Sequence, residues 1–560
     1  MAAALRAYLL LLLPWVLAGS ILPPLDPVQC SGVGGRLVNC TVTNTHGSFN
    51  DRKPCHVHGG GAGRGRSAGR EGEAQGEGGH EALPQLPQAG VPRRRPRRLS
   101  TARLDRVVRV DAATRRVTVE SGMLLRELVR EAVAAGMALP CSPNFYGVTV
   151  GGLLATGAHG SSLEGKGGAV HERVDRDAGA VGKKAVVREL GEDDPDLDAA
   201  KVSLGVLGVV SLQLEPLFKR SVTFLKKESD ADLAETVATW GRHHEFGEIM
   251  WMPGQGTVVL RKDDRVDVST PTTTTAREQE DRLQDEGSDE ALCRARLASN
   301  ELRGFGFTND GESFTAYPVV GYQHRIQASG LGEDDEGLRL LRESSSSISS
   351  CVWDPRIHGT FIHNPGFSVA LSNATAFVGD LLRLRDRSGR EAFCGLDMHG
   401  GVLFRYVKRS AAHLGLAEDS VSLDAMYYRS RRAEGGRPAL HADAFGEMEQ
   451  VALYKYGALP HWGKGPNYFF NDTAGRYPRL REFLDVKARF DPDGVFSSEW
   501  SDHVLGGRST VAMPAPGCAV DGLCTCTEDA HCAPGHVCSS GKVYPEARVC
   551  SAAQPSTAQM

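Results

Sequence analysis

The stretch that decides the fold is Gly151-Gly152-Leu153-Leu154-Ala155-Thr156-Gly157-Ala158-His159-Gly160-Ser161-Ser162. Glycine lets the backbone come close to a ligand and adopt positive φ, while successive amides and serine hydroxyls can surround a pyrophosphate. The stretch matches neither the G-x-G-x-x-G pattern nor a P-loop, so neither nicotinamide nor ATP binding follows from it. Read alone, it fits a cofactor loop and a flexible turn equally well.

Regular elements flank this stretch. Leu104–Val110 and Arg116–Val119 have strand character, and Met123–Gly136 has helical spacing that ends at glycine. Further along, helices such as Glu228–Gly241 alternate with strands such as Gly256–Arg261, which predicts α+β layering. A chain of 560 residues is also too long for one ordinary domain, so two to four are expected.

Composition excludes some classes of protein. Apolar residues make up 41% and charged residues 24%, so most of the chain can bury a core. The 64 basic residues minus 69 acidic residues give a net charge of −5. A general nucleic-acid binder is excluded, because no global positive field is available to attract phosphate.

The N-terminus predicts export. Arg6 precedes the apolar run Ala7–Leu17 and the small residues Ala18-Gly19-Ser20, the pattern of a secretory signal peptide over residues 1–20. The alternatives are an uncleaved anchor or a core helix, but the run is shorter than the roughly 20 residues a membrane span needs. No later stretch reaches that length, so we expect no transmembrane helix in the mature chain. Three glycosylation sequons are compatible with export, at Asn39, Asn373 and Asn471.

The C-terminus is rich in cysteine. Six of the 13 cysteines lie in the last 43 residues, at Cys518, Cys524, Cys526, Cys532, Cys538 and Cys550. In an oxidising compartment this density predicts three disulfides, with 15 connectivities open. Zinc is the alternative, but Cys524 and Cys526 are spaced C-x-C rather than the C-x2-C of a zinc knuckle, so no metal site is expected. Cys30, Cys40 and Cys55 are candidates for fixing the N-terminal segment.

Three motifs together resemble a known family. The glycine-rich stretch, followed about 45 residues later by AKVSLGVLGVVS (200–211), is similar to the flavin-binding domain of vanillyl-alcohol oxidase type proteins. His461-Trp462-Gly463-Lys464, framed as YGALPHWGK, resembles the signature of the aldonolactone oxidoreductases, and FDPDGVFSSEW (490–500) follows where that group leads one to expect it. With the leader and the cysteine-rich tail, the chain resembles the plant L-gulonolactone oxidase-like family.

The resemblance implies an architecture. We expect an α+β protein with a two-subdomain FAD-binding domain over 21–219, an α+β substrate (cap) domain over 220–505 and a small Cys-rich disulfide tail over 506–560. The leader pattern predicts the secretory pathway, with the extracellular space and cell wall or a vacuole as the expected destination and the endoplasmic reticulum left open. The residues implied to bind FAD are Gly151, Gly152, Thr156, Gly157, His159, Gly160, Ser161, Ser162, Gly205, Gly208 and Val209.

The resemblance also implies a chemistry. A flavin that oxidises a secondary alcohol takes hydride from carbon, and a fixed cation near its N1 favours the reduced form. Lys464 and Arg405 (in GVLFRYVK) are the candidate cations, either of which could instead polarise the substrate oxygen. His461 is the candidate for orientation or proton transfer. Trp462 is expected to be a packing wall, and Asp397 is a carboxylate that is structural or catalytic.

One segment departs from the family pattern. The family places a second flavin loop, commonly with a histidine near the ring, where this chain has the Gly- and Arg-rich segment 57–98. That segment shows neither helical nor strand periodicity. For one choice of codons from Glu73 onward, a one-base shift yields RRKVKVVTKLSHSSPKLAC, which resembles the missing strand and loop. We therefore interpret 57–98 as an out-of-frame translation, from a gene-model error or a real lesion.

The sequence thus predicts an FAD-dependent oxidase of a small-molecule aldonolactone, with O2 as electron acceptor. The specific expectation is oxidation of L-gulono-1,4-lactone at C2 to L-ascorbate with release of H2O2. The alternatives are a flavin oxidase or dehydrogenase for another sugar lactone or alditol, and a protein impaired by the 57–98 segment. A third is a secreted, flavin-free protein whose Cys-rich tail acts as a binding module.

Overall fold

The computed structural model describes the chain in part. Side chains are described over 104–141, 148–175, 188–205, 211–218, 227–262, 364–393, 401–425, 441–494, 500–506, 514–520 and 522–553, with single residues masked inside some ranges and a few described between them. Before residue 104, five short strands are described as backbone alone. They form a sheet in the order β1-β2-β3-β5-β4, with β3 and β4 both parallel to β5. Their bounds are β1 Val28–Ser31, β2 Val38–Val42, β3 Cys55–Gly59, β4 Glu73–Gln75 and β5 Arg97–Ser100.

These strands bear on the 57–98 segment. The end of β3, the whole of β4 and the start of β5 fall inside it, although its sequence shows no strand periodicity. The signal-peptide residues 1–20 lie outside the described residues.

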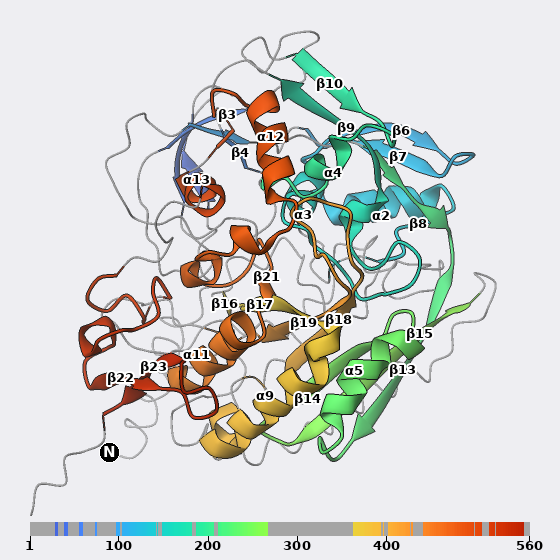
Figure 1. Ribbon diagram of the computed structural model, residues 1–560. Helices are drawn as coiled ribbons and strands as arrows, with labels where there is room; N and C mark the ends of the chain where they lie inside the picture. The colour runs from blue at the N-terminus through green and yellow to red at the C-terminus, as the bar shows by residue number, and fades with distance from the viewer. Residues whose placement is uncertain are drawn as a thin grey trace, which may run out of the picture.

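A second sheet carries the glycine-rich stretch. Its strands run antiparallel in the order β10-β9-β11-β7-β6, and short helices pack against them (Figure 1). The predicted strands and helix around 104–136 are confirmed as β6, β7 and α2. The elements are β6 Val107–Asp111, β7 Arg116–Val119, α2 Leu125–Ala134, α3 Val150–Ala155, β9 Val174–Val181, β10 Val186–Leu190, α4 Leu197–Ala200 and β11 Ser211–Gln213; the two-residue strands β8 Met137–Ala138 and β12 Glu215–Pro216 pair separately.

A third sheet of seven antiparallel strands forms the other half, in the order β13-β15-β14-β18-β19-β17-β21. Helices α5 and α9 lie along one of its faces, with α11 beside α9 (Figure 1). The elements are β13 Lys219–Lys227, α5 Leu233–His243, β14 Glu248–Met252, β15 Thr257–Val266, β17 Gly366–Ala370, α9 Ala374–Ser388, β18 Val402–Val407, β19 Ser420–Ala425, α11 Ala442–Gln450 and β21 Leu459–Pro460.

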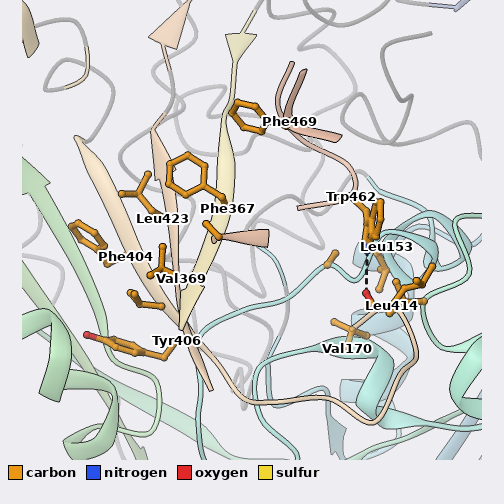
Figure 2. Packing of buried hydrophobic residues seen from close by; sticks show 14 of the residues in the cluster. Leu153, Val170, Phe367, Val369, Phe404, Tyr406, Leu414, Leu423, Trp462 and Phe469 are labelled. Carbon is orange, nitrogen blue, oxygen red and sulfur yellow. Dashed lines mark hydrogen bonds between the residues drawn. The ribbon is translucent and has the colours of Figure 1, made fainter. Parts of the chain in front are cut away.

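Strict alternation of side chains gives this sheet two different faces. Phe367, Val369, Phe404, Tyr406 and Leu423 are buried on the face toward the helices, as Figure 2 shows for the three neighbouring strands. The alternate positions on the opposite face carry charged and hydroxyl side chains that are nonetheless buried. The apolar face belongs to one continuous core that also includes α2 and α3 of the second sheet, so the two halves share a core.

The cysteine-rich tail is a small hairpin held by three disulfides. Strands β22 (His536–Ser540) and β23 (Arg548–Ala552) are antiparallel. The cysteines pair as Cys518–Cys524, Cys526–Cys538 and Cys532–Cys550, so the disulfide prediction is confirmed and the zinc alternative is not.

The tail docks on helix α11 through two buried side chains. The Glu447 carboxylate, 1% exposed, accepts hydrogen bonds from the amides of Lys542, Val543 and Tyr544 at 2.7, 2.5 and 2.9 Å. Gln450 accepts from the Arg548 amide and donates to its carbonyl, as a neighbouring strand would. These contacts make the tail part of the seven-stranded half rather than a module on a linker. Within the described part of the chain, the helices are all too short or too polar to cross a membrane.

Replacing Glu447 with Gln tests this docking. An amide keeps one acceptor oxygen and places a donor nitrogen against at least one of the three N–H groups, so we expect the variant to lose about 2–4 kcal/mol of stability, the cost of unmet hydrogen bonds to a buried charge. Hydrogen exchange over 541–553, followed by mass spectrometry, should accelerate together with a lower melting temperature. The exposed neighbour Glu546, changed to Gln, is the control. Unchanged exchange in E447Q would contradict the docking role.

Candidate active site

The His461–Lys464 motif forms a tight turn directly after β21. The Lys464 amide donates to the His461 carbonyl at 3.0 Å, and the Gly463 amide donates to His461 Nδ1 at 3.1 Å. The His461 amide in turn donates to the Gly366 carbonyl at 2.9 Å, which ties the turn to strand β17. The motif therefore holds its own shape and presents the two functional side chains at the edge of the sheet.

Trp462 anchors the turn, as predicted. Its ring is 4% exposed, stacks on Tyr477 at 5.1 Å, and donates through Nε1 to the Leu414 carbonyl at 3.0 Å. Figure 2 shows Trp462 close to Leu414 and to Leu153 of helix α3, and all three belong to the core that the two halves of the molecule share.

The turn brings Lys464 to a buried carboxylate that the sequence did not single out. Asp424 of β19 lies 2.9 Å from Lys464 Nζ through Oδ1, and its Oδ2 pairs with Arg405 Nη2 of the adjacent strand β18. Asp424 and Arg405 are each 4% exposed. The structure thus joins the two predicted cations through one shared carboxylate. The strand that carries this carboxylate, β19, has no motif that would have marked Asp424 in the sequence.

Gly366 makes this arrangement possible. A Cβ atom at that position would lie 2.7 Å from Lys464 Cδ and 2.8 Å from Asp424 Oδ1. Because real Cβ atoms do not approach that closely, a side chain at 366 would separate the ion pair. Gly366 is therefore a second functional position that the sequence analysis missed.

The charged side chains continue across the sheet. Glu248 of β14 faces Arg405 on one side and Arg261 of β15 on the other, and it pairs with Arg261 at 3.2 Å. All of these side chains are almost fully buried. In strand order the row reads Arg261, Glu248, Arg405 and Asp424, with Lys464 joining from the turn. Alternating charge along neighbouring strands is the arrangement that keeps buried ions compensated.

The glycine-rich stretch meets this row through His159. The Arg405 Nη1 donates to the His159 carbonyl at 3.0 Å, and the His159 and His461 rings lie 5.7 Å apart between centroids. Both rings line a cavity of about 40 Å³, together with Thr156, Ser368 and Pro460. Burial, then the charge of Arg405, lowers the pKa of His159 to about 3. Burial, then Lys464, lowers the pKa of His461 well below its usual value.

The rest of the stretch packs differently from the amide cradle expected of it. Several amides bond within the protein: Gly151 to Ser121, Gly157 to Leu154, Gly160 to Gly168 and Ser162 to Tyr406. The Gly152 amide donates to Thr149 Oγ1, the cap of α3, and Thr156 Oγ1 donates back to the Gly152 carbonyl. The Ser161 hydroxyl donates to the Gly247 carbonyl and accepts from the Tyr406 amide, so it joins the two halves. These groups hold the loop in place, and their contact with a cofactor stays a prediction.

The remaining predicted residues divide into described and undescribed ones. Gly205 is described, with φ of 82°, and its neighbour Leu204 bonds to the end of α3. Gly208, Val209 and Asp397 lie outside the described residues. Asn373 is exposed before α9, Asn471 is half-buried, and the side chain of Asn39 lies outside the described part.

Comparison with known proteins accounts for this arrangement. Three family models match: FAD binding domain over 97–175, D-arabinono-1,4-lactone oxidase over 362–504, and L-gulonolactone oxidase 2-like, C-terminal domain over 515–552. L-gulonolactone oxidase 2 of Arabidopsis thaliana is 40% identical over 582 residues, covering 94% of each chain. The chain belongs to the plant L-gulonolactone oxidase family.

Other relatives agree in kind. L-gulonolactone oxidase 5 of Arabidopsis thaliana is 39% identical over 94% of each chain. L-gulono-1,4-lactone dehydrogenase of Mycobacterium tuberculosis is 24% identical, covering 72% of this chain and 84% of its own. Among solved structures, cholesterol oxidase from B. sterolicum aligns with a TM-score of 0.54 at 14% identity, over 86% of this chain and all of its own. The fold is thus the expected α+β flavin-binding fold with a Cys-rich C-terminal segment, and the cofactor is FAD.

The described residues fit the ring end of that cofactor. Arg405, which is buried, and Lys464, which is largely buried, share the Asp424 carboxylate beside the glycine-rich stretch, and this places two positive charges where an electron-rich ring would lie. Arg405 and Lys464 are the residues that would hold and polarise it. The side chains of 57–98 and of 206–210, which include the predicted FAD-binding residues Gly208 and Val209, fall outside the described residues.

Replacing Asp424 with Asn tests the shared carboxylate. It leaves two buried cations with no formal counter-charge from this position, so we expect unfolding to become easier by about 3–5 kcal/mol at pH 7 in urea denaturation. Burial raises the pKa of Asp424, but Arg405 and Lys464 lower it by more, so the folded-state pKa lies well below the usual range. The stabilisation is complete above the unfolded pKa of about 3.9 and is lost as the pH falls below it.

The difference between wild type and D424N should therefore shrink between about pH 4 and pH 2. Asp485, an exposed aspartate 3.3 Å from Arg481 on helix α12 (Leu480–Phe490), is the control, and D485N should change stability little. Equal stability of D424N and D485N at pH 7 would contradict the role of Asp424.

Proposed function

We propose that the protein oxidises L-gulono-1,4-lactone, or a closely related aldonolactone, at C2, and that the product enolises to L-ascorbate. The observation that carries the proposal is the buried Arg405–Asp424–Lys464 group beside His159 and His461. A charged, water-poor site of this kind favours an electron-rich ring and a polar substrate together. The family models for a lactone oxidase and an FAD-binding domain, which meet at this site, support the same assignment.

The residues of this chain have distinct tasks in that reaction. Lys464, fixed by Asp424 and by the closeness of Gly366, directs a positive charge into the site. Arg405 joins the sheet to the loop that carries His159. FAD, when bound, would supply the hydride acceptor, and O2 would be the final electron acceptor with formation of H2O2. Trp462, which belongs to the shared core, packs at the junction next to these groups.

The electron acceptor separates two versions of this function. The relatives from Arabidopsis thaliana are named oxidases, and the relative from Mycobacterium tuberculosis is named a dehydrogenase. The higher identity to the oxidases favours O2 as acceptor. Turnover with O2 alone, compared with turnover by an artificial acceptor under nitrogen, separates the two.

Two further elements belong to the proposal. The leader pattern supports entry into the secretory pathway, toward the cell wall or a vacuole, and the three disulfides suit such a compartment. An impaired chain is the second candidate, because the FAD-binding model matches only from residue 97, just before the aberrant segment ends. The flavin-free binding module is disfavoured, since the tail is docked on α11.

The visible spectrum of the purified full-length chain tests the proposal. We expect a flavin band that bleaches anaerobically on addition of L-gulono-1,4-lactone, and H2O2 after air is admitted. A folded, colourless chain that stays colourless with added FAD would favour impairment. Flavin binding after restoration of the predicted reading frame in 57–98 would then assign the defect to that segment.

Replacing Lys464 with Met keeps the aliphatic stem and removes the charge. Loss of one preorganised charge from a site of this kind lowers kcat by roughly 10²–10³-fold, and we expect that loss in anaerobic bleaching by the lactone. Lys487, which donates to Ser497 from helix α12, is the control, and K487M should bleach like wild type. Normal bleaching by K464M would contradict the assigned role.

A further inference from the structure

The two histidines of the site come from opposite halves of the molecule. His159 belongs to the glycine-rich stretch and His461 to the turn after β21, and both line the cavity of about 40 Å³. The ring centroids are 5.7 Å apart. Each ring has one nitrogen held by the backbone, so the state of its other nitrogen can be worked out.

The backbone partners specify opposite tautomers. His159 Nδ1 lies 2.9 Å from the Gly160 carbonyl, which only accepts, so Nδ1 carries the hydrogen. His461 Nδ1 lies 3.1 Å from the Gly463 amide, which only donates, so Nδ1 is bare. In the neutral rings, His159 Nε2 is therefore an acceptor and His461 Nε2 carries a hydrogen.

Both rings are held neutral by their surroundings. The charged groups that act on them are Arg405 and Lys464, which oppose protonation, and Asp424, which favours it. Burial acts in the same direction as the two cations. These effects lower the pKa of both rings and so favour their neutral forms at pH 7, in which the donor and the acceptor are fixed.

We propose that His159 and His461 form a hydroxyl-binding pair, in which a ligand hydroxyl donates to His159 Nε2 and accepts from His461 Nε2–H. A hydroxyl is the group that both donates and accepts through one atom. With hydrogen bonds of about 2.8 Å on each side, one oxygen spans two nitrogens up to about 5.6 Å apart, a separation that the ring spacing accommodates.

The pair assigns the proton. This step rests on the proposed function, under which the bound hydroxyl is the one on C2 of the lactone. If bound FAD took the electron pair of the C2–H bond as hydride, the O–H bond would break with it and its proton would pass to His159 Nε2, which would leave a C=O group at C2. The hydroxyl proton becomes strongly acidic as hydride departs, so a weakly basic imidazole suffices. His159, rather than His461, is the proton acceptor.

Nitrogen NMR of histidine-labelled full-length protein tests the tautomers without any turnover. We expect His159 as the Nδ1–H form and His461 as the Nε2–H form at pH 7, from two-bond couplings assigned with single variants. The same tautomer on both rings, or a protonated ring at pH 7, would overturn the pair. This readout holds whether or not the lactone is the substrate.

Matched variants test the roles. H159N keeps a side-chain donor for the Gly160 carbonyl and removes the acceptor, so kcat should fall by roughly 10²–10⁴-fold. H461N keeps an acceptor for the Gly463 amide and removes the donor, so its main effect should be on KM. The wild-type rate should show no acid limb near pH 6.5.

The outcomes separate the two proposals. If lactone bleaches the wild-type flavin but H159N keeps its kcat, or an acid limb near pH 6.5 disappears in H461N, the pair is wrong and the function stands. If no lactone bleaches the flavin but the two opposite tautomers are found, the choice of C2 hydroxyl fails and the hydroxyl-binding pair stands.

Discussion

The carboxylate of Asp424 is the interaction on which the site depends. It forms ion pairs with Arg405 of the neighbouring strand and with Lys464 of the turn after β21. All three residues lie at the junction of the two halves. Arg405 extends the connection to the His159 carbonyl in the glycine-rich stretch. Buried cations without a counter-charge are strongly destabilising, so the strands, the turn and the loop must assemble together for any of them to be stable.

The two faces of the seven-stranded sheet explain how such a site can exist. The apolar face packs against α5 and α9 and supplies the hydrophobic free energy of the half. This leaves the opposite face free to carry the row from Arg261 to Lys464, whose charges alternate and so offset much of one another's desolvation. The cysteine-rich tail packs against the same half through hydrogen bonds to Glu447. It contributes to the stability of that half and supplies none of the site residues named above.

The sequence predicted the parts of the site that carry local motifs. The glycine-rich stretch and His461–Lys464 are contiguous, so their residue types and order are visible in one chain. Asp424 was missed because it sits in VSLDA, where alternation predicts a strand but nothing shows which partners the second face meets; Asp397 was considered instead. Gly366 was missed for a related reason. A side chain at this position is excluded by contact with Lys464, which lies 98 residues further along the chain. The internal partners of the amides in the glycine-rich stretch could not be predicted, because some of them, such as the Tyr406 carbonyl, are also distant in sequence.

Charge and hydrogen-bond direction are linked in this site. One carboxylate shared by two cations leaves the surroundings of His159 and His461 positive, and a positive surrounding opposes protonation of both rings. A neutral imidazole has one donor and one acceptor nitrogen, whereas an imidazolium has only donors. Only in the neutral ring can a hydrogen bond to the backbone determine the tautomer. The Gly160 carbonyl favours the Nδ1–H tautomer of His159, and the Gly463 amide favours the Nε2–H tautomer of His461. The direction in which a hydroxyl can bind thus follows from Asp424, two backbone groups and the burial that the fold provides.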